Sequence, residues 1–348
     1  MISVILAGGK GLRLWPESRR SRPKQLCKFV DNRSMLDHTI DRLINLGSRR
    51  IIIITSDDLK PSIQALVQQR PDGGCIDILS EPVGKNTAPA VGMALARCLD
   101  EALDDVLGIF PADHHILDNR AFEESIRRAV KAAQQGCVVT IGITPSRPET
   151  GYGYIEKTKW EIASLDNVYQ VNSFCEKPDL NIAQAYLNSG SHMWNAGIYI
   201  AKGGTLLEEF ARHLPEIYEN IIKGLEGYIS SYENLPEISL DYGIAEKSDR
   251  MAVVPADFGW CDLGGWNALE ELYEVDKDNN VVCGEDAIPL DSRNCVIKQC
   301  DKSIVLFGVD RLLVVETDDV IFIADRNRAQ EVRTVVDTLY QLNRHDLL

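Results

Sequence analysis

Short apolar runs alternate with amphipathic stretches through residues 1–145 of the chain. Each run has the length and composition of a buried strand. The runs are Ser3–Ala7, Arg50–Thr55, Ile76–Leu79, Val106–Phe110 and Val138–Ile143. Strands that alternate with helical stretches predict an α/β fold with a doubly wound, mostly parallel sheet. Ligands of such sheets bind at the carboxyl ends of the strands, so the residues that follow these runs are candidates for a site.

Local signals mark the ends of two expected helices. Ser34 and Asp37 form the pattern of a capping box, and Gly47 stands where a helix would end. The apolar positions between them repeat at helical spacing: Leu36, Ile40, Leu43 and Ile44. A second helix is expected after Asn86, with Val91 and Leu95 on its apolar face.

The pattern changes near residue 145. Further strands are expected around 151–155, Val168–Phe174 and Ala196–Ile200, with longer connections between them. This arrangement predicts that residues 1–145 form one half of a domain, and the motifs described below imply that this half binds the nucleotide. Residues 146–276 would then be an elaborated substrate-binding half on the same sheet.

A second change comes near residue 277. Beyond it, apolar runs recur at about eight-residue steps with no helix between them: Cys295–Ile297, Ile304–Leu306, Leu312–Val315 and Val320–Ile323. They predict a small β-rich domain over 277–348, built as a few coils of a β-helix. Arg328–Leu342 is expected to close it as a helix with one apolar face: Val332, Val335, Val336, Leu339 and Leu342. This domain could form the contact of a homodimer or cover the larger domain, and the sequence leaves both open.

Charge narrows the class of ligand. The net charge of -15 disfavours nucleic acid and anionic membranes as partners, since both are negative. One segment is nevertheless basic, with Arg13, Arg19, Arg20, Arg22, Lys24 and Lys28. A local basic cluster in an acidic chain indicates a small anionic ligand. Nine scattered cysteines without a C-x-x-C pair favour reduced thiols in a cytoplasmic protein over a disulfide framework or a zinc site.

The basic segment begins with a glycine-rich turn directly after the first strand, Leu6-Ala-Gly-Gly-Lys-Gly-Leu-Arg13. Glycines let the main chain approach a ligand closely, and successive N–H groups can hold phosphate oxygens. The turn lacks the GK[ST] of a P-loop, and Leu14 stands where the G-x-G-x-x-G pattern needs its third glycine. Neither a P-loop NTPase nor a dinucleotide-dependent dehydrogenase is therefore supported.

The segment resembles the signature of sugar-1-phosphate nucleotidyltransferases, in the form typical of mannose-1-phosphate guanylyltransferases. The matching residues are Gly8, Gly9, Gly11, Arg13, Leu14, Trp15, Pro16, Ser18, Arg19, Pro23, Lys24 and Gln25. Leu12 departs from the Thr or Ser usual in the wider family. Seven further motifs follow in family order: Glu81-Pro82 with Asn86–Ala90, Phe110–His114, Gly151–Glu156, Phe174–Pro178, Trp194–Ile198, Ser239–Gly243 and Trp260–Trp266.

This resemblance implies transfer of GMP from GTP to α-D-mannose 1-phosphate, giving GDP-mannose and pyrophosphate with Mg²⁺. It implies a GTP site of Ala7, Gly8, Gly9, Lys10, Gly11, Arg13, Lys24, Gln25, Glu81, Asn86, Ala88 and Pro89. It implies a sugar-phosphate site of Gly153, Glu176, Lys177, Asn195 and Asp241, and metal ligands Asp113 and Asp262. Arg13, Lys24 and Lys177 would be the catalytic cations, and Glu81 could accept hydrogen bonds from the N1 and N2 edge of guanine.

Other interpretations of these residues stay open. Asp113 alone could be a helix N-cap, Lys24 a surface charge, and Glu176 with Lys177 a solvated ion pair. At the level of the whole chain, three alternatives remain: a non-catalytic sugar-nucleotide sensor on the same fold, a nucleotidyltransferase for another base or sugar, and a bifunctional enzyme. Loss of a charged motif residue would favour the sensor, but all are present, and an added isomerase domain is not expected within 348 residues.

Overall fold

The computed structural model describes residues 1–9, 11–101 and 103–348. Within them, nine strands form one sheet in the order β3-β2-β1-β4-β9-β6-β10-β8-β7. The strands are β1 (Ile2–Leu6), β2 (Arg50–Ser56), β3 (Ile76–Glu81), β4 (Val106–Pro111), β6 (Val138–Ile143), β7 (Tyr154–Glu161), β8 (Tyr169–Cys175), β9 (His192–Lys202) and β10 (Met251–Ala256). The expected α/β class is confirmed, and each of the five strands expected from the apolar runs is present.

The sheet is mixed. β3, β2, β1 and β4 pair in parallel, with Val4 opposite Ile52 on one side and Ile109 on the other. β6 and β10 are also parallel. β9 runs antiparallel between β4 and β6, and β7 and β8 add antiparallel pairs at the far edge. The mostly parallel arrangement expected from the sequence therefore describes the first half of the chain, while the second half contributes the antiparallel strands.

The helices begin and end near the positions that the sequence indicates. They are α1 (Met35–Asn45), α2 (Lys60–Gln68), α3 (Thr87–Cys98), α4 (Asn119–Gln134), α5 (Leu180–Ser189), α6 (Gly203–His213), α7 (Pro215–Ile221), α8 (Gly224–Ser231) and α9 (Val332–Gln341). The capping box before α1 is confirmed, since the Asp37 N–H donates to Ser34 Oγ over 3.1 Å while that hydroxyl donates to the Asp37 carboxylate. No helix among the described residues combines the length and the apolar character needed to cross a membrane.

The chain divides into two compact units. The sheet unit comprises Met1–Gly8, Ile40–Ala112 and Ile116–Trp260. The β-helix unit comprises Gly9–Thr39, Asp113–His115 and Cys261–Leu348. The chain thus passes from one unit to the other inside the glycine-rich turn, and the basic segment belongs with the C-terminal residues. Two short strands lie at further crossing points: β5 (His115–Ile116) and β11 (Trp260–Cys261).

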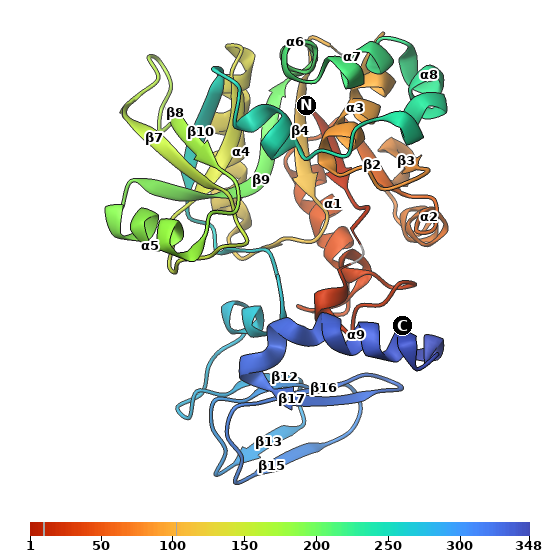
Figure 1. The fold of residues 1–348 in the computed structure, drawn as a ribbon, viewed down its shortest axis with the longest axis vertical. Helices are drawn as coiled ribbons and strands as arrows, with labels where there is room; N and C mark the ends of the chain where they lie inside the picture. The colour runs from red at the N-terminus through yellow and green to blue at the C-terminus, as the bar shows by residue number, and fades with distance from the viewer. Residues whose placement is uncertain (10, 102) are drawn as a thin grey trace. The chain divides into compact units, whose positions relative to one another are not determined.

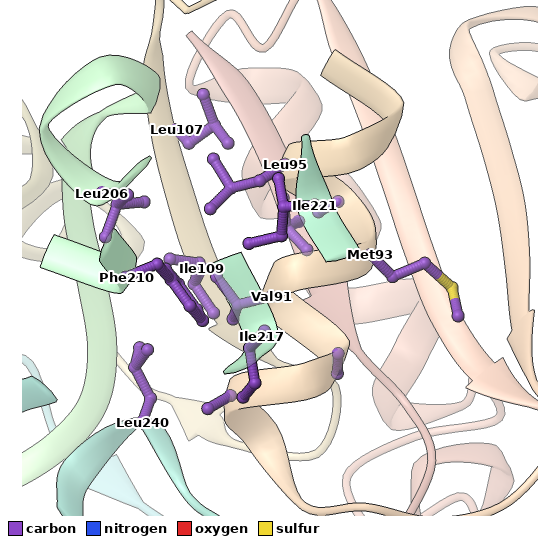
Figure 2. Packing of buried hydrophobic residues seen from close by; sticks show 14 of the residues in the cluster. Val91, Met93, Leu95, Leu107, Ile109, Leu206, Phe210, Ile217, Ile221 and Leu240 are labelled. Atoms are coloured by element: carbon purple, nitrogen blue, oxygen red, sulfur yellow. The ribbon is translucent and has the colours of Figure 1, made fainter. Parts of the chain in front are cut away.

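The sheet unit has its main core between the sheet and α3. Val91 and Leu95 of α3 are fully buried, and Phe210 of α6 and Ile217 of α7 pack around them (Figure 2). Leu107 of β4 belongs to the same cluster. Burying such side chains stabilises the fold by about 1.5–3 kcal/mol each. This core fixes the start of α3, where the segment Asn86–Ala90 lies.

The β-helix unit contains the coils that the eight-residue steps predict. Its strands are β12 (Val281–Cys283), β13 (Ala287–Leu290), β14 (Val296–Lys298), β15 (Ile304–Phe307), β16 (Leu312–Glu316) and β17 (Ile321–Asp325). β12, β14 and β16 stack in parallel along one wall, β13 and β15 form another, and β17 pairs antiparallel with β16. Parallel stacking at successive turns of the chain confirms the expected β-helix.

α9 closes the unit and joins it to the basic segment. Val332 and Val336 are buried in the same core as Leu14 and Trp15. Figure 1 shows α9, in blue, running beside the red segment that follows β1. Leu342 is 65% exposed, so the expected apolar face ends one turn earlier than the sequence predicts. The reason is that the helix itself ends at Gln341.

Candidate active site

One cavity in the β-helix unit gathers residues from all three of its chain segments. Its volume is about 480 Å³, within the roughly 300–1,000 Å³ of small-molecule sites. Its lining residues are Gly11, Leu12, Arg13, Leu14, Lys24, Asp113, His114, Asp262, Leu263, Gly264 and Arg333. We call it the Lys24 cavity. Four charged residues expected from the sequence, Arg13, Lys24, Asp113 and Asp262, therefore meet at one place.

Lys24 connects the two aspartates of this cavity. Its side chain is 9% exposed, and its Nζ lies 2.8 Å from Oδ2 of Asp113. The same ammonium donates a hydrogen bond to the main-chain carbonyl of Asp262. Burial by itself raises the pKa of the Asp113 carboxyl, but Lys24 and His114 outweigh it and hold the pKa below its ordinary value. Asp113 is thus ionised at neutral pH.

The two carboxylates of the cavity are suited to a divalent cation. Asp262 follows β11, and its Oδ1 accepts a hydrogen bond of 2.9 Å from the N–H of Gly264. Asp113 follows β4, so both come from the carboxyl ends of strands. Carboxylate oxygens are the hard donors that Mg²⁺ prefers, and one or two are enough when water and phosphate complete the shell. The ammonium of Lys24 beside Asp113 marks a position where a positive charge is already stabilised.

The glycine-rich turn packs directly against Lys24. Gly11 has φ of 56°, and a Cβ on it would lie 2.5 Å from the Cβ of Lys24. The Ser18 hydroxyl donates to the Gly11 carbonyl over 2.6 Å, and Gln25 Nε2 donates to the Gly9 carbonyl over 3.1 Å. Only glycine combines this conformation with this close approach. The side chains of Ser18 and Gln25 therefore hold the turn in place through two of its carbonyl groups.

The side chains of two arginines of the Lys24 cavity have no partner among the described residues. Arg13 and Arg333 are both exposed, and neither guanidinium group makes a hydrogen bond or an ion pair within residues 1–9, 11–101 and 103–348. Guanidinium groups bind carboxylate and phosphate oxygens through paired N–H donors. The cavity therefore offers two unused cationic donors in addition to Lys24.

Glu81 occupies a buried position at the end of β3 in the sheet unit. It is 7% exposed, and its Oε1 accepts a hydrogen bond from the Tyr232 hydroxyl. Its Oε2 would lie 2.9 Å from a Cβ at Gly8, so a glycine there makes room for the carboxylate. Burial raises the pKa of Glu81, and the bond from Tyr232 offsets part of that rise. The carboxylate is held in one orientation with Oε2 toward the glycine-rich turn.

The first turn of α3 is held by a neighbouring tyrosine. Asn86 has φ of 69°, and its Oδ1 accepts a hydrogen bond of 2.9 Å from the N–H of Thr87 at the start of α3. The Tyr228 hydroxyl donates to the Pro89 carbonyl over 2.8 Å, and Ala88 is fully buried. Tyr228 and Tyr232 contact each other edge to face, so one pair of rings supports both Glu81 and this segment.

A buried hydrogen-bond network holds Asp241. Its Oδ1 accepts bonds from the Tyr199 hydroxyl at 2.6 Å and from Asn195 Nδ2 at 3.0 Å. Asn195 Oδ1 in turn accepts from the Thr140 hydroxyl at 2.7 Å and the Gly197 N–H at 3.1 Å. Nearly all of the hydrogen-bonding capacity of Asn195 is therefore used inside the protein. Its effect on a bound sugar would pass through Asp241.

Glu176 and Lys177 form an ion pair beside this network. Lys177 Nζ lies 2.9 Å from Glu176 Oε1, and the side chains of Lys177 and Glu176 are 56% and 7% exposed, respectively. A Cβ at Gly153 would lie 2.6 Å from Glu176 Oε2, so this glycine is what lets the carboxylate pack. Burial and then Asp241 raise the pKa of Glu176. Burial lowers the pKa of Lys177, but Glu176 and Asp241 outweigh it and raise the pKa. The ammonium stays charged and accessible.

The residues expected from the sequence thus fall into two groups. Ala7, Gly8, Glu81, Asn86, Ala88, Pro89, Gly153, Glu176, Lys177, Asn195 and Asp241 lie in the sheet unit. Gly9, Gly11, Arg13, Lys24, Gln25, Asp113 and Asp262 lie in the β-helix unit. Lys10 lies outside the described residues. The ligands of all these residues stay predictions.

Sequence reasoning missed several residues of the site. Tyr199 follows Asn195 by four positions on β9, so the alternation of a strand could have placed both on one face. Tyr232 and Arg333 come from segments that no motif marks, and only their tertiary contacts bring them to Glu81 and to the Lys24 cavity.

Comparison with known families assigns a class to this fold and site. The nucleotidyl transferase family matches residues 2–279. A second family, described as the MannoseP isomerase/GMP-like beta-helix domain, matches residues 285–339. The first match spans the main sheet and all the site residues expected from the sequence. The second spans most of the β-helix strands and much of α9.

Individual relatives narrow the assignment. The alginate biosynthesis protein AlgA of Pseudomonas putida is 36% identical over 99% of this chain and 72% of its own length. Mannose-1-phosphate guanylyltransferase of Klebsiella pneumoniae is 36% identical over 99% of this chain and 75% of its own length. A crystal structure from Thermus thermophilus, named mannose-1-phosphate geranyltransferase, is 35% identical with a TM-score of 0.89 and covers 97% of this chain and 99% of that one. The chain therefore belongs to the mannose-1-phosphate guanylyltransferase family of nucleotidyl transferases.

Proposed function

We propose that this chain transfers GMP from GTP to α-D-mannose 1-phosphate and releases GDP-mannose and pyrophosphate. The observation that carries the proposal is the Lys24 cavity, where cationic side chains and two carboxylates of the family motifs converge. The choice of guanine and mannose is supported by the full-length similarity to a guanylyltransferase. The catalytic domain is proposed to end near residue 276, where the β-rich domain begins.

The reaction needs little covalent chemistry from the protein. A sugar 1-phosphate is an anion near neutral pH because its second pKa is about 6, so no general base is required. One of its oxygens attacks the α-phosphorus of GTP in line, and the bond from that phosphorus to the bridging oxygen of pyrophosphate breaks. The protein has to align two anions and neutralise their repulsion. Arg13, Lys24 and the N–H groups of the turn at 9–11 would hold the triphosphate.

The acceptor would be held by residues of the sheet unit. The exposed ammonium of Lys177 is suited to the phosphate of mannose 1-phosphate. The carboxylates of Glu176 and Asp241 are suited to sugar hydroxyls, and the bonds from Tyr199 and Asn195 hold Asp241 for this role. Asn86, Ala88 and Pro89 would position the base beside Glu81.

Members of this enzyme class use a divalent metal, and the donor set of the Lys24 cavity is compatible with Mg²⁺. Asp113 and Asp262 would hold it. When bound, the ion would offset negative charge on the α-phosphate. Lys24 would keep Asp113 ionised and oriented before substrate arrives.

Pyrophosphate release tests the proposal directly. The assay combines each of GTP, ATP, UTP and dTTP with mannose 1-phosphate or glucose 1-phosphate. Release that is fastest with GTP and mannose 1-phosphate is the expected result. Equal turnover of ATP and GTP would contradict the guanine assignment. If none of the pairs released pyrophosphate, catalysis itself would be contradicted and a sugar-nucleotide sensor favoured.

Glu81→Gln should erode the preference for guanine. A carboxylate can accept bonds from both N1–H and the 2-amino group of guanine, whereas a glutamine offers one oxygen. Loss of a charged hydrogen bond costs about 1.5–3 kcal/mol, or roughly 10- to 150-fold in kcat/KM for GTP. The GTP/ITP ratio is the sharper readout, because ITP lacks the 2-amino group. Glu233→Gln, at an exposed position beside Tyr232, is the matched control, and an unchanged ratio in Glu81→Gln would refute this role.

The affinity for GTP should depend on the ionisation of Glu81. The carboxylate accepts both bonds only when it is deprotonated, and burial raises its pKa above the ordinary 4.5. The KM for GTP should therefore rise as the pH falls through that raised pKa, with full affinity above it. Tyr232→Phe removes a bond that lowers this pKa, so it should move the rise to higher pH. The dependence should vanish in Glu81→Gln; its persistence there would assign it to another group.

Two further properties stay proposals. All nine cysteines are free, which supports a reducing cytoplasmic location. A homodimer is supported by an apolar face on β13 and β15, where Ile288, Leu290, Val305 and Phe307 are 46–75% exposed. Sedimentation equilibrium should find a dimer that Phe307→Asp weakens, and a monomeric wild-type chain would contradict it.

A further inference from the structure

Arg333 stands in the first turn of α9, far along the chain from the nucleotidyltransferase motifs. It nevertheless lines the Lys24 cavity together with Arg13 and Lys24. The α9 helix belongs to the β-helix domain, for which neither the motifs nor the proposed reaction supplies a role. A side chain of this domain thus reaches the cavity in which the phosphates would bind.

Packing fixes the position of Arg333. Its neighbour Val332 is 2% exposed and Val336 is 5% exposed, and both share a core with Leu14 and Trp15. The Trp15 indole also donates a hydrogen bond of 2.7 Å to the Leu347 carbonyl, beyond the end of α9. The helix and the basic segment therefore belong to one compact unit, in which Figure 1 shows them side by side. The buried apolar core that Val332 and Val336 share with Leu14 and Trp15 therefore fixes the main chain of Arg333 next to the segment that carries Arg13.

Arg333 differs from three neighbouring arginines of the C-terminal segment, each of which forms an ion pair. Arg326 pairs with Glu270, Arg328 with Glu331 at 2.6 Å, and Arg344 with Asp346 at 2.7 Å. Arg333 has no such partner among the described residues. In the cavity itself, the ammonium of Lys24 already pairs with Asp113 at 2.8 Å. Arg13 and Arg333 are therefore the two arginines of the cavity with no protein partner among the described residues, and they add to the positive charge of Lys24.

We infer that Arg333 binds the β- and γ-phosphates of the nucleotide, the part that leaves as pyrophosphate. This inference rests on the proposed function. The sugar-phosphate residues Glu176 and Lys177 lie in the sheet unit, so the Lys24 cavity is assigned to the nucleotide phosphates. Two guanidinium groups match a pyrophosphate group, which presents several oxygens and up to four negative charges. The β-helix domain would thereby contribute directly to substrate binding.

Direct binding and kinetics together test Arg333. Inorganic pyrophosphate is titrated calorimetrically into the full chain and into Arg333→Gln. Loss of the guanidinium should weaken pyrophosphate binding about 10-fold or more. The KM for GTP, and the KM for pyrophosphate in the reverse reaction, should rise by a similar factor. The KM values for mannose 1-phosphate and GDP-mannose should stay within about twofold, because those ligands lack the terminal phosphates.

Two variants make the result specific. Arg333→Lys keeps the charge without the paired donors, so it should recover only part of the affinity. Arg328→Gln removes a neighbouring arginine that already pairs with Glu331, and it should bind pyrophosphate like the wild type. Wild-type pyrophosphate affinity in Arg333→Gln, or an equal loss in Arg328→Gln, overturns the inference. A wild-type chain that turned over none of the nucleotides would instead defeat the proposed function, since pyrophosphate binding is measured without turnover.

Discussion

Turnover should fall by roughly 10²-fold or more in Asp113→Asn and in Asp262→Asn, a loss comparable to removing one preorganised electrostatic group. Both carboxylates line the Lys24 cavity, and asparagine keeps the shape of each while removing its charge. If both hold one Mg²⁺, each substitution weakens the same ion. Steady-state rates at increasing Mg²⁺ or Mn²⁺ measure the effect, and excess metal should recover part of the lost rate.

The double variant separates a shared metal from two independent roles. Removing either ligand disables the same ion, so the combined loss should be close to that of the more damaging single change. Losses that simply multiply would assign the two aspartates to different steps. Full activity in Asp262→Asn would remove Asp262 from the metal site.

The same two variants should differ in thermal stability. The ammonium of Lys24 forms an ion pair with the carboxylate of Asp113. From Asp262 it contacts the main-chain carbonyl and not the carboxylate. Asparagine at 262 leaves that carbonyl in place, whereas asparagine at 113 leaves a buried ammonium without its counter-ion. Differential scanning calorimetry should find a lower Tm for Asp113→Asn and little change for Asp262→Asn. Lys24→Met in the Asp113→Asn background should restore part of the Tm.

Lys177→Ala should impair the use of mannose 1-phosphate far more than the use of GTP. Its ammonium is accessible, and it is held by a buried carboxylate at the proposed sugar-phosphate site. Loss of a charged bond to the acceptor phosphate lowers kcat/KM for mannose 1-phosphate roughly 10- to 150-fold. Initial rates with each substrate varied in turn give the two constants, and fluorescence titration gives the affinity for GTP.

A second lysine provides the control for Lys177. Lys159 is exposed on β7 of the same unit, and Lys159→Ala should leave both constants unchanged. Lys177→Arg keeps the charge and should retain more activity than Lys177→Ala. Equal damage to GTP and mannose 1-phosphate in Lys177→Ala would place this lysine at the nucleotide.

The strands could be predicted well because their signal is local. Val138–Ile143 is a mostly apolar run, interrupted by Thr140, and the structure gives the same bounds because both faces of β6 are buried. The partner of a strand is not a local property. Nothing in the run itself indicates that β9 would enter antiparallel between β4 and β6. The mixed sheet therefore had to come from the structure.

The residues of the candidate site likewise include some that local motifs predict and some that only tertiary packing brings in. Lys24, Asp113 and Asp262 were expected because each stands in a motif, and the structure brings all three to one cavity. Tyr232 reaches Glu81 from a segment 151 residues later, and the contact depends on how α8 packs against α3. Arg333 depends likewise on the docking of α9. Tyr232 and Arg333 belong to no motif with a recognisable spacing, so the sequence alone does not indicate them.

The discontinuous β-helix unit has a consequence for biosynthesis. The Trp15 indole finds its acceptor at Leu347, 332 residues further along the chain. A ribosome that adds about 5–20 residues per second delivers this partner roughly 15–70 s after Trp15 has been made. The apolar core around Leu14 and Trp15 includes Val315 and Val336, which also arrive late. The glycine-rich turn is thus made well before the residues of its core, and the Lys24 cavity can assemble only after α9 has left the ribosome.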